Sequence, residues 1–87
     1  MHERALMNDV MRKIESVARE SGAARVTRVS VRLGALSHFT PEHFREHFAD
    51  AARATVAEGA GIDAVVETDL ESPSATGVVI ESVEVES

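Results

Sequence analysis

Hydrophobic residues recur along the first quarter of the chain at the spacing of one helix face. They follow one another at steps of four, four and three residues, as they do on the buried side of an α-helix. Gly22 comes next and can take the left-handed conformation that commonly ends a helix. The pattern predicts a helix over residues 3–21. The recurring residues are Leu6, Val10, Ile14 and Val17.

Alternation of apolar and polar residues predicts three strands. Residues 24–33 alternate with a period of two, which is typical of a strand with one wet face, and residues 62–68 do the same. A third alternating segment spans residues 78–85. Its spacing slips by one residue, which predicts a β-bulge near Glu81 and Ser82.

A second helix is predicted between the first two strands. Thr40 is a suitable N-cap, Pro41 is tolerated at the first helical position, and Glu42 suits the positive end of the helix dipole. Apolar and small residues then share one face, and we expect this helix to close near residues 58–59. The residues on that face are Phe44, Phe48, Ala51, Ala52 and Thr55.

These elements follow the order αβαββ and predict an α+β fold. The simplest way to bury the apolar stripes is to pack two helices on one face of a three-stranded mixed β-sheet. The chain has 87 residues, which is enough for a single small domain over residues 1–87 with a thin core. Residues 69–76 read as a short connection between the second and third strands.

Charge and composition exclude several classes of function. Residues 1–53 hold all nine Lys and Arg, whereas the remainder holds eight acids and no Lys or Arg, so we expect no nucleic-acid binding. The chain has no Cys, which excludes disulfides and thiolate chemistry. No apolar run is long enough to span a membrane, and the charged start does not read as a signal peptide. We therefore expect a cytoplasmic protein that does not bind membranes.

The start of the chain is the first candidate for chemistry. A free α-amine has a pKa of about 7.7–8, so the amine of Met1 is available to a metal ion near neutral pH. The imidazole of His2 can close a chelate with that amine, and backbone nitrogens can join it. A near-planar set of nitrogen ligands suits Ni(II) or Cu(II). Many unrelated proteins also begin with Met-His, so these residues alone are weak support.

Three further features each have a simpler interpretation. His43 and His47 match the H-x-x-E-H pattern of a class of zinc peptidases, but a peptidase needs a third ligand and a cleft, so a solvated helix face is favoured. His38 is a lone loop histidine, which is usually just exposed but can supplement a metal site if the loop folds toward Met1. The acidic residues of the last strand fit an outward strand face. We expect no enzyme.

Five segments, in order along the chain, together resemble the HypA/HybF family. Members of this family are accessory factors in the maturation of [NiFe] hydrogenases and, in some bacteria, of urease. The resemblance runs from end to end of the chain. The segments are Met1-His2-Glu3, residues 31–37, residues 40–42, residues 57–60 and residues 80–86.

The resemblance implies a nickel carrier. The family's nickel site uses the N-terminal amine, here on Met1, the imidazole of His2 and the backbone around His2 and Glu3; His38 is a candidate additional ligand. The implied cargo is Ni(II), and the implied partners are a HypB-like GTPase and the large subunit of a [NiFe] hydrogenase. We also expect the third strand to lie at a sheet edge, where a second copy can pair to form a homodimer.

Two departures from the family pattern leave an alternative open. Family members carry a zinc domain with two Cys-x-x-Cys pairs where this chain has only residues 69–76, so no zinc is expected here. An acidic residue is common in the family at the position of Thr40, so a supporting carboxylate near the nickel is missing here, and His38 is a candidate to compensate for it. The alternative function is therefore a metal-free, HypA-like adaptor that binds maturation partners without delivering nickel.

Overall fold

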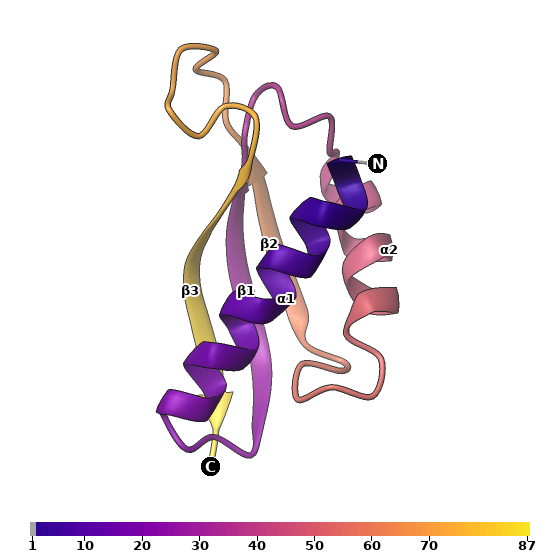
Figure 1. Cartoon of the computed structure of the whole chain (residues 1–87), viewed down its shortest axis with the longest axis vertical. Coiled ribbons are helices and arrows are strands. Elements are labelled where there is room, and N and C mark those ends of the chain that lie inside the picture. Colours follow the sequence, from indigo (N-terminus) through magenta and orange to yellow (C-terminus); the bar gives the residue numbers. More distant parts are fainter. Residues whose placement is uncertain (1) are drawn as a thin grey trace.

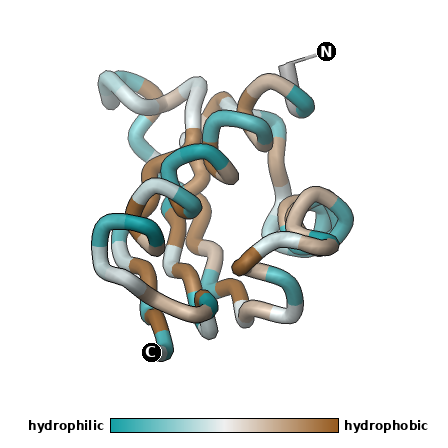
Figure 2. Tube along the Cα trace, turned by 60° about the horizontal axis from the view of Figure 1, so that its bottom comes forward, coloured by the Kyte–Doolittle hydropathy of each residue, from teal (hydrophilic) through white to brown (hydrophobic). Residues whose placement is uncertain are grey.

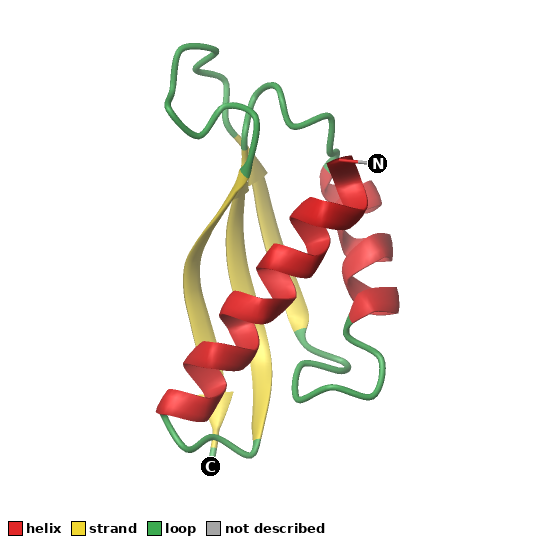
Figure 3. Cartoon of the chain, viewed as in Figure 1, coloured by secondary structure: helices red, strands yellow, loops and turns green. Residues whose placement is uncertain are grey.

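The computed structural model describes residues 2–87, with the side chains described from residue 4 onward. It contains two helices and three strands in the predicted order αβαββ (Figures 1 and 3). Within the described residues, no helix is long and apolar enough to cross a membrane. The elements are α1 (His2–Glu20), β1 (Arg25–Leu33), α2 (Pro41–Ala51), β2 (Gly61–Val66) and β3 (Val78–Glu86).

The sheet has the order β2-β1-β3, with β1 in the centre. β1 pairs with β2 in parallel and with β3 in the antiparallel direction, so the predicted mixed sheet is confirmed. Ser30 lies opposite Ser82 and Val31 lies opposite Ile80, which leaves Glu81 as the extra residue of the predicted bulge. β3 is an edge strand, as expected. A second irregularity at Thr27 was not predicted.

Both helices cover the same face of the sheet, and the hydrophobic core lies between the two layers (Figures 1 and 2). The inward side chains of β1 meet Ile14 of α1 and the two phenylalanines of α2 in this core. Val17 was expected on the buried face of α1, but it is 42% exposed. The buried stripe of α1 instead runs through Met7, Val10, Met11, Ile14 and Ala18.

α1 ends where the sequence predicts. Gly22 has a φ of 67°, in the left-handed region, and the N–H of Ala23 donates to the carbonyl oxygen of Ala18 at 2.9 Å. This arrangement satisfies a carbonyl that the helix itself leaves without a partner. The turn then leads directly into β1.

α2 ends at Ala51, so the prediction that it extends to residues 58–59 is wrong. Thr55 explains part of the difference, because its Oγ1 donates to the carbonyl of Ala52 at 2.7 Å and accepts from the N–H of Ala57 at 3.1 Å. Ala54 takes a left-handed φ of 64°, which no α-helix accommodates. The N–H of Val26 donates to the carbonyl of Val56, which ties the turns after α2 to the start of β1.

The connection between β2 and β3 packs against the segment that follows β1. The N–H of Gly34 donates to the carbonyl of Gly77 at 2.8 Å, and the N–H of Leu36 donates to the carbonyl of Ala75 at 2.6 Å. A Cβ atom on Gly34 would overlap the carbonyl oxygens of Ser74 and Ala75, so only glycine fits at this position. This contact fixes the start of the loop that carries His38.

Candidate metal-binding site

His38 lies in the loop between β1 and α2, at a position that its neighbours determine. Ser37 and Phe39 are buried on either side of it, whereas His38 itself is exposed. His38 has a φ of 68°, a left-handed conformation that is uncommon for a residue other than glycine. The loop therefore holds two buried side chains in the protein and directs the imidazole between them toward its surface.

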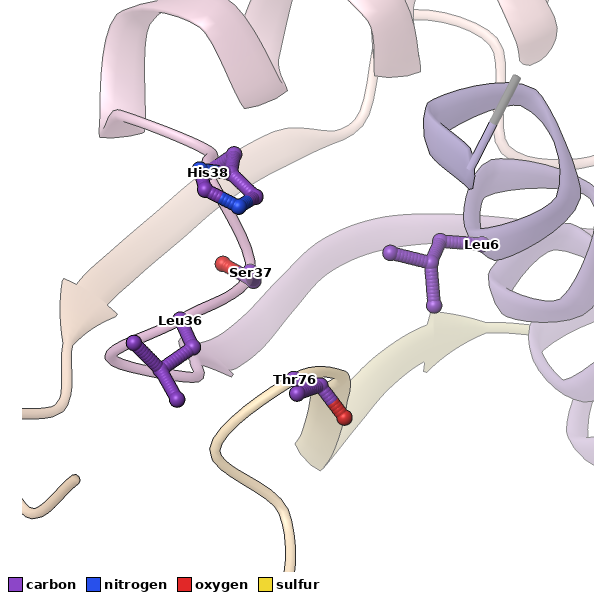
Figure 4. A pocket seen from close by; sticks show the side chains of 5 residues that line it. All are labelled: Leu6, Leu36, Ser37, His38 and Thr76. Carbon is purple, nitrogen blue, oxygen red and sulfur yellow. The ribbon is translucent and has the colours of Figure 1, made fainter.

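His38 lines a pocket of about 350 Å³ at the end of the molecule where α1 begins. Figure 4 shows His38 and Leu6 on opposite sides of this pocket, one from the loop and the other from α1. Leu36 and Ser37 belong to the same loop, and Thr76 comes from the connection before β3. The pocket was not predicted from the sequence, because its walls come from three segments far apart in the chain.

The predicted nickel ligands at the start of the chain are not placed by the structure. Met1 lies outside the described residues, and so do the side chains of His2 and Glu3. The backbone of α1 is described from His2 onward, and His2 precedes Leu6 by one helical turn.

The first turn of α2 has the predicted capping arrangement. Thr40 is the N-cap in an extended conformation, and its Oγ1 accepts a hydrogen bond from the backbone N–H of His43 at 3.1 Å. Pro41 occupies the start of the helix, and Glu42 lies in the first turn. Thr40 therefore stabilises the helix terminus that carries the next pair of candidate residues.

His43 and His47 are brought together by the helix. Their Nε2 atoms are 2.8 Å apart, their ring centroids are 4.5 Å apart, and the ring of Phe39 lies within 5.8 Å of one and 6.3 Å of the other. The shared helix face was predicted from the spacing of four residues. The contact between the two ring nitrogens and the support from Phe39 were not predicted, because both depend on side-chain rotamers and on the path of the loop.

His47 lines a hollow together with Glu46, Asp50 and Arg53, so the charges around it are mixed. Arg53 forms an ion pair with Asp50 on the last turn of α2 at 3.0 Å, and Arg45 donates to the carbonyl of Ile62 at 3.3 Å.

On the open face of the sheet, the hydrogen bond and the charge of Asp63 raise the pKa of the Arg28 guanidinium above its usual value. Among the side chains that the structure describes, those of residues 4–87, no three His, Cys, Asp or Glu residues are arranged to hold one metal ion.

Residues 1–85 match the model of the HypA family, described as hydrogenase/urease nickel incorporation metallochaperones. The chain belongs to the HypA family. It is 45% identical over 65 residues to hydrogenase maturation factor HypA 1 of Bradyrhizobium diazoefficiens, a match that covers 75% of this chain and 58% of that protein. It is 41% identical over 63 residues to HypA of Methylocella silvestris, covering 72% of this chain and 56% of that protein.

The fold of this HypA-family chain is also found in a solved structure, the solution structure of the Ni metallochaperone HypA from Helicobacter pylori. The two superpose with a TM-score of 0.77 at 17% identity, over 99% of this chain and 98% of that chain. This match confirms the predicted α+β fold class. The matches to the curated relatives span less than two thirds of those proteins' lengths.

Proposed function

We propose that this HypA-family chain carries Ni(II) for the maturation of a [NiFe] hydrogenase. The observation that carries the proposal is the family match over residues 1–85, combined with a start of Met1-His2-Glu3. In this proposal the α-amine of Met1, the imidazole of His2 and the backbone nitrogens of His2 and Glu3 hold the ion. A set of nitrogen ligands in one plane suits Ni(II) better than it suits Mg(II) or Ca(II).

The helical start of the chain supports this ligand set. α1 begins at His2, and the first four N–H groups of a helix have no acceptor within the helix. Backbone nitrogens at positions 2 and 3 can therefore be committed to a metal ion without the loss of any helical hydrogen bond. In the middle of a helix, the same nitrogens would have to give up helical hydrogen bonds to bind a metal ion.

His38 is the proposed additional ligand or supporting group. It lines a pocket with Leu6, and His2 precedes Leu6 by one helical turn. The loop that carries His38 thus faces the first turns of α1. The buried neighbours Ser37 and Phe39 hold the backbone of this loop in place, which supports His38 as a ligand on the side of α1.

We infer a single HypA-like domain over residues 1–87 whose zinc domain is replaced by the connection around residues 69–76; without Cys it does not hold zinc in the family's manner. The proposed partners are a HypB-like GTPase and a hydrogenase large subunit, in the cytoplasm. No role with nucleic acid or membranes is proposed. A homodimer, if formed, would pair through the exposed edge of β3.

A Ni(II) titration of the chain with a native Met1 tests this function. Calorimetry should show one ion bound with high affinity and visible absorbance a square-planar d–d band, and His2→Ala should abolish the high-affinity signal and the band. Absence of binding, or binding that His2→Ala leaves unchanged, contradicts the carrier. If partner capture then survives His2→Ala without loss of nickel-enzyme activity in cells, the metal-free adaptor is supported instead.

A further inference from the structure

We infer that His43 and His47 form a second, open binding site for a divalent transition-metal ion on the surface of α2. The histidines lie four residues apart, and their Nε2 atoms are 2.8 Å from each other. His43 is half-buried and His47 is exposed, so the site opens to solvent. The choice of Ni(II) as its ion rests on the proposed function, whereas the ligand pair itself does not.

The distance between the two nitrogens matches ligands of one metal ion. Imidazole nitrogens bind transition metals at about 2.0–2.1 Å, so two of them at a right angle stand about 2.9 Å apart, and at a tetrahedral angle about 3.4 Å apart. The observed 2.8 Å fits the right angle. Imidazole nitrogen suits Ni(II), Cu(II) and Zn(II), so the pair defines a class of divalent transition-metal ion rather than one member.

The two rings are held close together before an ion binds. Phe39, which is 4% exposed, contacts both of them, and Phe44 and Phe48 fix α2 against the core on the adjacent face. In the free protein the two Nε2 atoms are at the distance of an N–H···N hydrogen bond, which one ring donates and the other accepts. For metal binding both rings carry their proton on Nδ1, so the donating ring changes tautomer and no net proton is released.

The surroundings favour a cation that is held loosely. Glu46 and Asp50 follow His43 and His47 by three residues each and therefore lie on the same side of the helix. Glu46 adds negative charge there, whereas the charge of Asp50 is balanced by its ion pair with Arg53. Both acids and His47 line a shallow hollow together with Ala49 and Arg53. Because two imidazoles leave most positions of a metal ion open, ligands of a donor or acceptor protein can exchange onto it. A two-ligand site suits transfer of an ion rather than storage.

Ni(II) titration of the full chain, followed by imidazole ¹H–¹⁵N spectra, tests the site. The ring signals of His43 and His47 should shift or broaden as Ni(II) is added. The double variant His43→Ala/Ala49→His is the matched control, because it keeps two exposed imidazoles on α2 but places them two residues apart. Loss of a group that only supports a metal ligand typically weakens metal affinity about 10–100-fold. Because this variant separates the two ligands themselves, it should weaken Ni(II) binding at the pair by more than that.

The His2→Ala variant separates this inference from the proposed function. If both sites exist, His2→Ala loses the visible d–d band and keeps the response of the His43 and His47 rings. Ring responses without the square-planar d–d band in the wild-type chain would support the pair and contradict the N-terminal site. Unresponsive rings, an equal response in the control variant, or a ring response that disappears with His2→Ala would each overturn the second site.

Discussion

Two pairs of aromatic side chains on α2 share the same spacing of four residues but have different roles. Phe44 and Phe48 are 0% and 2% exposed and pack in the core, with ring centroids 6.2 Å apart. His43 and His47 precede them by one position each and lie at the edge of the helix, with two nitrogens in contact. Successive side chains of a helix differ in direction by about 100° around its axis. The histidine pair therefore lies on a different side of α2 from the phenylalanine pair that packs in the core.

Phe44→Ala should give the largest effect on stability. Truncation of a fully buried Phe typically costs about 3–5 kcal/mol of unfolding free energy, a large part of the total for a small domain. Urea denaturation followed by circular dichroism measures the loss. A change below about 1 kcal/mol would show that the core does not depend on this side of α2.

Gly34→Ala should give the second largest effect, because the added Cβ meets the carbonyl oxygens of Ser74 and Ala75. We expect a loss of about 1–3 kcal/mol, typical of overpacking. Gly77→Ala is the matched control, since the nearest atom to its added Cβ is at 4.0 Å. Equal stability of the two variants in thermal unfolding would contradict the packing described for the His38 loop.

Thr40→Ala should cost about 1 kcal/mol, the usual loss for removal of an N-cap. The hydroxyl accepts the hydrogen bond of the His43 N–H, so the loss falls on the helix end that carries the histidine pair. Thr40→Asp should keep the cap and restore stability in the same denaturation experiment. An Asp variant as unstable as the Ala variant would show that Thr40 acts in another way.

His47→Ala should have the smallest effect on stability, within about 0.5 kcal/mol, because the side chain is exposed and Ala favours helix. Its effect on metal binding by the pair should nevertheless be large. A loss of stability comparable to that of the Phe variant would assign His47 a structural role.

Much of the fold was predictable, because its signals are local. The alternation through Val29, Val31 and Leu33 identified the inward face of the central strand, all of it at most 2% exposed. The slip in spacing located the bulge at Glu81, and Thr40-Pro41 located the start of α2. Each of these features depends on residues that are neighbours in the sequence.

The features that were missed depend on contacts between distant segments. α2 stops at Ala51 partly because Val26 takes the carbonyl of Val56 as its acceptor, and no pattern around residue 51 reveals that partner. The contact of the His43 and His47 nitrogens depends on the path of Phe39, and the His38 pocket depends on three separate segments. The nickel ligands at Met1, His2 and Glu3 remain a prediction from the family.

The most direct test of the proposed nickel carrier is its Ni(II) affinity when the α-amine of Met1 is displaced. Adding one Gly ahead of Met1 leaves every side chain in place but moves the free amine away from His2. The extended chain should lose the square-planar absorbance and its high-affinity calorimetric signal. Unchanged affinity and an unchanged visible band would contradict the N-terminal site.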